Sequence, residues 1–196
     1  MDSKFVFPAK QNNPQSWYWF RTGFTSEELQ KIKEITDNID FINASTFANE
    51  EENTIRRSKV KWIPQSEDTA WLYDKMMSMI VEANDSQWNF DISYANELIQ
   101  YTEYWHDEKG HYGWHQDIGP NEGSLRKISV TIQLSEGDEY EGGDLQISMG
   151  EGADNTCPRG AGVAVIFPSY MMHRVTEVTS GVRKSLVLWV GGSHYR

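Results

Sequence analysis

The sequence has little of several features that mark particular classes of protein. One cysteine, Cys157, in 196 residues excludes an intrachain disulfide and is typical of a reducing compartment. There is no apolar run of about 18 residues, and no charged segment followed by an apolar one at the start. We therefore expect a soluble, cytoplasmic protein with neither a signal peptide nor a membrane partner.

Positive charge is also scarce. The chain has 18 Lys and Arg against 29 Asp and Glu, which gives a formal net charge of -11. Because nucleic-acid affinity rests largely on cationic side chains that displace counterions, this balance counts against a nucleic-acid partner. The length fits a single domain over residues 1–196 with a sizeable core, present as a monomer or a homodimer.

Helical signals are confined to the first half of the chain. After an aromatic strand at 17–20, Thr25 and Glu28 form a capping box, and apolar residues at helical spacing continue the helix to about Asp37. The polar stretch 43–54 has no periodicity and predicts a surface loop. A second helix is expected from Ser66, as its N-cap, to about 83. Its predicted buried face consists of Trp71, Leu72, Met76, Met79, Ile80 and Ala83.

Helical periodicity stops after the second helix, and strand-like segments separated by turn residues follow at short intervals. These segments are 97–105, 111–117, 126–135, 143–148, 161–167, 171–178 and 182–190. Two helices followed by many strands indicate an α+β fold in which the helices pack on one face of a β-sandwich or barrel.

His115-Gln116-Asp117 is the first candidate for a site with chemistry. In a strand, residues i and i+2 project from the same face, so His115 and Asp117 would point together. Two histidines and one carboxylate form the facial triad that binds Fe(II) and leaves three coordination positions open. A His-x-Asp tripeptide alone is a weak signal, and an ordinary polar surface strand is the alternative.

A later histidine and an arginine complete the pattern. His173 lies among apolar residues, where a histidine is more often a hydrogen-bonded core residue than a ligand. Arg183 begins the inner face of an apolar strand and therefore needs an anionic partner, either a cofactor carboxylate or an internal salt bridge. Strand alternation turns Lys184 to the opposite face. Together with the three possible metal ligands, Arg183 favours a cofactor carboxylate as its partner over an internal salt bridge.

The order of these motifs resembles the Fe(II)/2-oxoglutarate dioxygenases of the prolyl 4-hydroxylase type, in particular the bacterial and phage-borne PKHD-type hydroxylases. The resemblance covers about residues 97–192. It is carried by Tyr104, Gly110, His115-Gln116-Asp117, Tyr140 to Leu145, Gly160-Ala161-Gly162, Phe167-Pro168-Ser169, His173-Arg174-Val175 and Gly181-Val182-Arg183. It implies a double-stranded β-helix (jelly roll) as catalytic core at 97–192. Residues 1–96 would then supply helices packed on the major sheet and a substrate loop.

The resemblance also implies roles for single residues. His115, Asp117 and His173 would bind Fe(II), and Arg183 would pair with the distal carboxylate of 2-oxoglutarate. Contacts to 2-oxoglutarate are expected from the faces that strand alternation turns inward; these are Tyr104, Thr131, Gln133, Ser185 and Trp189. The alternative for the strand at 126–135 is that its polar face, which includes Thr131 and Gln133, is exposed to solvent.

Substrate contacts are expected from segments over the mouth of the jelly roll. Arg56-Arg57-Ser58 with Trp62 resembles the Arg-x-Ser region of prolyl hydroxylases, and two aromatic residues lie next to the metal motif. The expected substrate residues are therefore Arg57, Ser58, Trp62, Tyr112 and Trp114. The alternative for the arginine pair is a solvated surface patch.

By resemblance, the protein hydroxylates a peptidyl residue, proline in the first place, and converts 2-oxoglutarate and O2 to succinate and CO2, with ascorbate as reductant. A free amino acid or another small molecule is the alternative substrate. A non-catalytic jelly-roll module for metal binding or sensing is the alternative of a different class. Nucleic-acid demethylation is disfavoured, because demethylases generally carry an arginine where this chain has Trp189.

Overall fold

The computed structural model describes residues 14–40, 42–43, 55–93, 95, 97–119, 125–150, 152 and 154–193. Two helices, α1 (Ser26–Asp37) and α2 (Ala70–Gln87), lie in the first half of the chain. The strands are β1 (Tyr18–Phe20), β2 (Ile42–Asn43), β3 (Arg56–Arg57), β4 (Lys59–Ile63), β5 (Ile99–Trp105), β6 (His111–His115), β7 (Arg126–Gln133), β8 (Tyr140–Gly142), β9 (Leu145–Ser148), β10 (Asp154–Thr156), β11 (Ala164–Pro168), β12 (His173–Val175) and β13 (Val178–Gly191).

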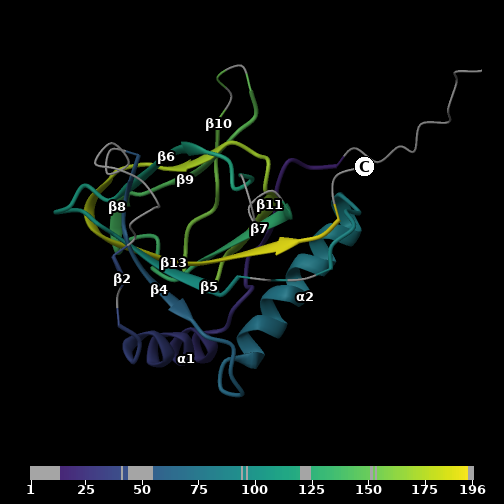
Figure 1. Ribbon diagram of the computed structural model, residues 1–196. Helices are drawn as coiled ribbons and strands as arrows, with labels where there is room; N and C mark the ends of the chain where they lie inside the picture. Colours follow the sequence, from purple (N-terminus) through teal and green to yellow (C-terminus); the bar gives the residue numbers. More distant parts are fainter. Residues whose placement is uncertain are drawn as a thin grey trace, which may run out of the picture.

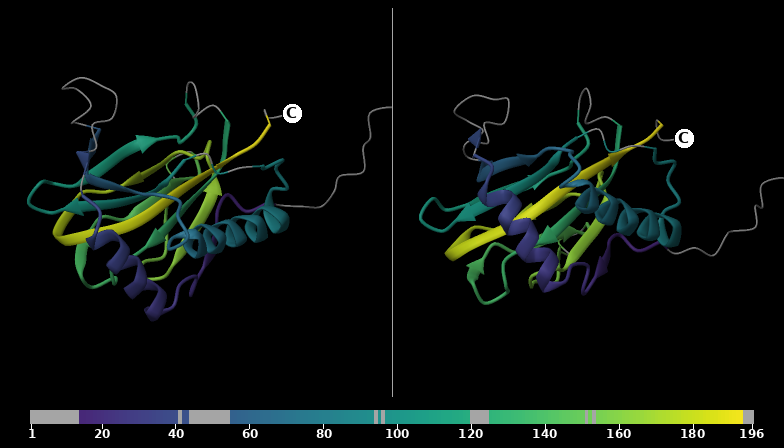
Figure 2. Two further views of the ribbon diagram at one scale, coloured as in Figure 1. Left: turned by 60° about the horizontal axis from the view of Figure 1, so that its bottom comes forward. Right: turned by 90° about the horizontal axis from the view of Figure 1, so that it is seen from below.

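These strands form two antiparallel sheets. The large sheet has the order β1-β11-β7-β13-β5-β4-β2, with β8 also paired to β13, and the small sheet has the order β10-β9-β12-β6-β3. Figure 1 shows the two sheets facing each other, with α1 and α2 on the side of the large sheet that is away from the small one. From below, both helices lie in front of the large sheet, and α1 crosses the long strand β13 (Figure 2).

The large sheet buries a different kind of side chain on each of its two faces. On β7, Ile128, Val130 and Ile132 belong to an apolar cluster that includes buried residues of α1 and α2. The residues between them in sequence point into the space between the sheets, because side chains alternate along a strand. A second apolar cluster, which includes Phe167 and Val175, fills part of that space. The rest of the space holds the polar site.

The first helix is as predicted, and the second differs at both ends. The Thr25 side chain accepts a hydrogen bond from the Glu28 backbone, and the Glu28 carboxylate accepts one from the Thr25 backbone. Ser66 is not the N-cap of α2, because its carbonyl accepts backbone hydrogen bonds from Thr69 and Ala70 and so closes a separate turn. The helix begins at Ala70 and continues to Gln87.

The buried face of α2 also differs from the prediction. Trp71 is only partly buried, whereas Tyr73 is buried and joins two strands. Its hydroxyl donates to the carbonyl of Ile63 in β4 at 2.6 Å and accepts from the backbone N–H of Ile99 in β5 at 2.9 Å. A tyrosine whose hydroxyl finds partners can be buried as readily as an apolar residue.

The sequence patterns did not predict β2, β3, β4, β8 and β10, although the alternation in β4 is visible in the sequence. Of the polar stretch 43–54, Asn43 belongs to β2 and residues 44–54 lie outside the described residues. β13 is longer than predicted. Its first part pairs with β8 and its later part with β5 and β7. Gly181 lies between these parts with φ 70°, and a Cβ there would approach the Glu139 carbonyl oxygen to 2.1 Å.

Within the described residues, no helix is long and apolar enough to cross a membrane.

Candidate metal and cosubstrate site

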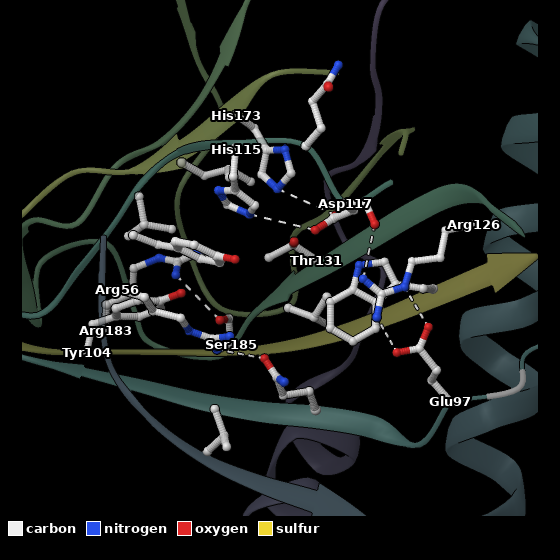
Figure 3. A pocket seen from close by; sticks show the side chains of 18 of the residues that line it. Arg56, Glu97, Tyr104, His115, Asp117, Arg126, Thr131, His173, Arg183 and Ser185 are labelled. Carbon is white, nitrogen blue, oxygen red and sulfur yellow. Dashed lines mark hydrogen bonds and ion pairs between the residues drawn. The ribbon is translucent and has the colours of Figure 1, made fainter. Parts of the chain in front are cut away.

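A cavity of about 410 Å³ lies between the two sheets, and the predicted metal and cosubstrate residues line much of it (Figure 3). The small sheet contributes His115 from β6 and His173 from β12, and Asp117 follows β6. The large sheet contributes Arg183 and Trp189 from β13, with further polar residues from β5 and β7. The two groups of side chains therefore face each other across one space.

His115, Asp117 and His173 converge at one end of this cavity. Their potential ligand atoms all lie within 4.8 Å of one another. The His115 Nε2 atom is 3.7 Å from Asp117 Oδ1, and His173 Nε2 is 3.5 Å from Asp117 Oδ2. Direct pairing of His173 with His115 between β12 and β6 brings the two rings together.

Both histidines present the nitrogen that a metal would need. The Nδ1 atom of His115 lies 2.8 Å from the Gly113 carbonyl, and that of His173 lies 2.9 Å from the Met171 carbonyl. A carbonyl only accepts, so each Nδ1 carries the hydrogen and each Nε2 lone pair points at the cluster. Burial, together with the nearby His173, lowers the pKa of His115 to about 4. His115 is therefore neutral near pH 7, which is the form that binds metals.

Asp117 is held by contacts that strand alternation does not provide, since β6 ends at His115 and not at 117 as predicted. Its backbone N–H donates to the Ser169 carbonyl at 2.9 Å, and the Ser129 hydroxyl donates to Oδ2 at 2.6 Å. Burial acts to raise the pKa of Asp117, but the two histidines and the Ser129 hydrogen bond outweigh it and the pKa is lowered. The carboxylate is thus ionised and fixed in place.

Arg183 is the most deeply buried charged residue of the cavity wall, with 1% of its surface exposed. Its Nη2 donates to Gln133 Oε1 at 3.0 Å and its Nη1 to Ser185 Oγ at 3.4 Å, both neutral groups. No carboxylate of the described residues lies within ion-pair distance, and Nε has no partner there. The alternative of an internal salt bridge is therefore not seen in this part of the chain, and the guanidinium suits an anionic ligand.

The polar face of β7 is buried, so the alternative of a solvent-exposed face is wrong. Ser129, Thr131 and Gln133 have exposed fractions of 0%, 6% and 2%. Thr131 lines the cavity, and so do Ser185 and Trp189 of β13. Tyr104 of β5 places its ring 5.4 Å below the Arg183 guanidinium. The structure thus brings all of the predicted 2-oxoglutarate residues to one cavity or to Arg183 itself.

The predicted substrate residues divide into two groups. Trp62 and Tyr112 line the cavity, and Ser58 accepts a hydrogen bond from a cavity residue. Arg57 is exposed outside the cavity, and its neighbour Arg56 lines it instead. Since β3 is extended, adjacent side chains point to opposite faces, and Arg56 takes the inner one.

Trp114 also lies outside the cavity and packs against Arg174, whose guanidinium is 4.6 Å from its ring. Alternation would put Trp114 on the same face as Tyr112. However, His173 pairs with His115 while Val175 pairs with Tyr112, which indicates a β-bulge in β6. The bulge turns Tyr112 and His115 to the same side, where their rings stack at 3.5 Å.

Comparison with known proteins agrees with this geometry. Residues 99–191 match the 2OG-Fe(II) oxygenase superfamily. A PKHD-type hydroxylase of Crocosphaera subtropica is 28% identical over 172 residues, covering 85% of this chain and 74% of that protein. One from Teredinibacter turnerae is 43% identical over 86 residues, covering 41% and 38%. This chain contains a 2OG-Fe(II) oxygenase domain.

Solved structures show the fold of the oxygenase domain. A Pseudomonas putida prolyl-4-hydroxylase superposes with a TM-score of 0.69 at 19% identity, covering 91% of this chain and 93% of that one. A Trichoplax adhaerens prolyl hydroxylase superposes with a TM-score of 0.73 at 20% identity, covering 90% and 84%. The predicted jelly roll is confirmed. The protein is an oxidoreductase of a superfamily that uses Fe(II), 2-oxoglutarate and O2.

The oxygenase domain has further cavity residues that sequence reasoning did not assign. Arg126 forms an ion pair with Glu97, with Nε 2.6 Å from Oε1, and donates to the Asp117 carbonyl at 3.1 Å. Its guanidinium lies 4.1 Å from the Trp189 ring. Gln100 accepts a hydrogen bond from Arg56 across the cavity. Strand parity puts Gln100 on the same face as Tyr104, but no sequence signal links Glu97 to Arg126.

Proposed function

We propose that this oxygenase domain hydroxylates a peptidyl residue, proline in the first place, with 2-oxoglutarate and O2 as cosubstrates and succinate and CO2 as coproducts. The observation that carries the proposal is the composition of one cavity. Three converging ligand atoms lie at one end, and a buried guanidinium with neutral partners lies on the facing wall.

The triad fits Fe(II) in both donor type and protonation. His115 and His173 would bind through Nε2 and Asp117 through a carboxylate oxygen, because both Nδ1 atoms are taken up by carbonyls. Two imidazoles and one carboxylate are the ligand set of non-haem Fe(II) oxygenases. When bound, the iron and 2-oxoglutarate would supply the O2-dependent chemistry that hydroxylates a C–H bond.

Arg183 would bind the distal carboxylate of 2-oxoglutarate. Gln133 and Ser185 would hold the guanidinium in place, and the ring of Tyr104 would support it. Thr131 and Trp189, which line the same cavity, would complete the cosubstrate wall. A guanidinium pairs with a carboxylate through two parallel hydrogen bonds, which fixes the orientation of the ligand as well as its affinity.

We also propose different roles for the two halves of the chain. Residues 97–192 would carry the iron and the cosubstrate. Residues 1–96 would support the major sheet through α1 and α2 and contact the substrate near Arg56 and Trp62. Burial of Leu72, Met76 and Ile80 in one cluster with the outer face of the large sheet supports this role for α2.

Two observations support a peptidyl substrate. The Pseudomonas putida neighbour is a prolyl-4-hydroxylase, and the Trichoplax adhaerens neighbour was solved with a peptide fragment of the hypoxia inducible factor oxygen degradation domain. A free amino acid or another small carboxylate is the second candidate. It is favoured by Arg56, which contacts no carboxylate among the described residues.

Turnover of 2-oxoglutarate tests the proposal. Protein with Fe(II), ascorbate and a panel of proline-containing peptides should form succinate, and one peptide should gain an oxygen atom by mass spectrometry. His115→Ala and Arg183→Ala should each abolish both signals, because they remove a metal ligand and the cosubstrate anchor. Binding of metal and 2-oxoglutarate without succinate formation for any substrate would favour a non-catalytic module.

A further inference from the structure

Arg56 enters the cavity from β3 and is fixed there by neutral groups. Its Nε donates to Ser58 Oγ at 2.8 Å, and its Nη2 donates to Gln100 Oε1 at 2.8 Å. The same Gln100 oxygen accepts a hydrogen bond from the Thr102 hydroxyl at 3.2 Å, which fixes the orientation of the amide that binds Arg56. The guanidinium also lies 4.8 Å from the centre of the Tyr112 ring. Three contacts, to Ser58, Gln100 and Tyr112, give this planar cation a defined position.

The charge of Arg56 is not balanced by a carboxylate in the described part of the chain. Three arginines line the cavity, and their partners differ. Arg126 has an ion pair with Glu97, while among the described residues the hydrogen-bond partners of Arg183 and Arg56 are neutral. Arg183 is accounted for by 2-oxoglutarate in the proposed function. A partly buried cation without a counterion is costly unless an anion joins it, so Arg56 calls for a second anionic group.

Arg56 is close to the triad but separate from Arg183. The Tyr112 ring, which Arg56 covers on one side, stacks on the His115 ring at 3.5 Å. Arg56 is anchored by Ser58 and Gln100, whereas Arg183 is anchored by Gln133 and Ser185, so the two guanidinium groups have different partners. Because Tyr112 contacts both Arg56 and His115, an anion bound by Arg56 would lie on the side of the cavity that faces the triad. That is where a substrate must place its reacting C–H bond.

We infer that Arg56 binds a carboxylate of the substrate, so that the hydroxylated carbon lies near an acidic group. This inference rests on the proposed function and narrows its substrate class. The carboxylate has two possible sources: the α-carboxylate of a free amino acid, and the side chain of Asp or Glu next to the hydroxylated residue of a peptide. Both would use the same guanidinium fork.

Binding without turnover tests the inference. The protein is loaded with Mn(II) and 2-oxoglutarate under nitrogen and titrated in a calorimeter with two matched pairs of probes. The first pair is L-proline and L-prolinamide. The second is acetyl-Glu-Pro-Gly-amide and acetyl-Gln-Pro-Gly-amide. The carboxylate member of at least one pair should bind about 10- to 100-fold more tightly, the range expected for hydrogen bonds to a charged group. The pair that shows the difference identifies the source.

Variants then assign the preference to Arg56. Arg56→Gln should reduce the carboxylate preference to less than about two-fold and leave the affinity for the neutral probe unchanged. Arg56→Lys should keep part of the preference, because an ammonium retains the charge without the planar fork. The adjacent Arg57→Gln, outside the cavity, should retain the full preference. Unchanged melting temperatures would show that each variant is folded.

Three results would overturn the inference: no carboxylate preference in either pair, a preference that survives Arg56→Gln, or one that Arg57→Gln removes.

Titration of 2-oxoglutarate into the Mn(II)-loaded protein separates these results from failure of the proposed function. If 2-oxoglutarate does not bind the wild type, the proposed function is wrong. If it binds equally to wild type and Arg56→Gln while the probes show no preference, only the role of Arg56 is wrong. A large loss of 2-oxoglutarate affinity in Arg56→Gln would assign Arg56 to the cosubstrate instead.

Discussion

Replacement of Arg183 by methionine distinguishes a guanidinium kept for a ligand from one kept for stability. Arg183 is buried, and its hydrogen-bond partners in the described residues, Gln133 and Ser185, are neutral. Methionine removes the desolvation cost of the buried charge but leaves the Gln133 oxygen without its donor, which costs about 1–3 kcal/mol. Because these effects offset, the unfolding free energy of the unliganded protein should change by about 1 kcal/mol or less.

The response to 2-oxoglutarate should change far more. At a ligand concentration 100 times the Kd, binding stabilises the native state by about 2.7 kcal/mol, or about 5–10 °C in Tm for a chain of this size. Loss of one partner of a buried charge pair costs about 2–5 kcal/mol of binding, which raises the Kd at least about 30-fold. At the same concentration, Arg183→Met should then gain less than about 1 kcal/mol.

Thermal unfolding with Mn(II), in the absence and presence of 2-oxoglutarate, measures both effects in one assay. We expect similar unliganded Tm values for wild type and Arg183→Met, and a much smaller 2-oxoglutarate shift in the variant than in the wild type. A fall of the unliganded Tm that corresponds to 3–5 kcal/mol would indicate a broken internal ion pair. A 2-oxoglutarate shift in the variant as large as in the wild type would show that the cosubstrate binds elsewhere.

Three further predictions concern the contacts around the site. Ser129→Ala removes the donor to Asp117 and should weaken Mn(II) binding about 10- to 100-fold in calorimetry, whereas Ser135→Ala outside the cavity should not; equal affinities would contradict the positioning role. Tyr73→Phe should lower the unfolding free energy by about 1–3 kcal/mol in urea and leave Mn(II) affinity unchanged, because two backbone groups lose a partner. Thr25→Ala should cost about 1 kcal/mol through loss of the capping box, and a neutral result would show that α1 contributes little to stability.

Features set by local sequence were predictable. The capping box of Thr25 and Glu28 depends on residues three apart, and α1 forms where it was expected. Parity along β13 separates Arg183 from Lys184, and parity along β7 turns Thr131 and Gln133 inward. In each case the strand or helix is regular, so its period fixes the direction of the side chain.

Features that depend on contacts far apart in the sequence were not predictable. Asp117 lies beyond the end of β6 and is held by Ser129 and Ser169, which come from other strands and turns. The β-bulge in β6 turns Tyr112 inward and Trp114 outward against simple alternation, and only the pairing with β12 reveals it.

The predictions that Ser66 begins α2 and that Arg57 contacts the substrate failed for a related reason. Ser66 has the right residue type for an N-cap, but its carbonyl is engaged in a turn that ends with Thr69. Arg56 and Arg57 look equivalent in sequence, and the face of β3 that each occupies follows from the pairing of β3 with β6. Residue type thus predicted the kind of contact, while the tertiary partner decided its position.

The most direct test of the site is a crystal structure of the protein with Fe(II) and 2-oxoglutarate grown without oxygen, with iron located by anomalous scattering. We predict one iron per chain bonded to His115 Nε2, His173 Nε2 and an Asp117 carboxylate oxygen, with the distal carboxylate of 2-oxoglutarate on Arg183. Iron bound at other residues, or 2-oxoglutarate bound away from Arg183, would contradict the account.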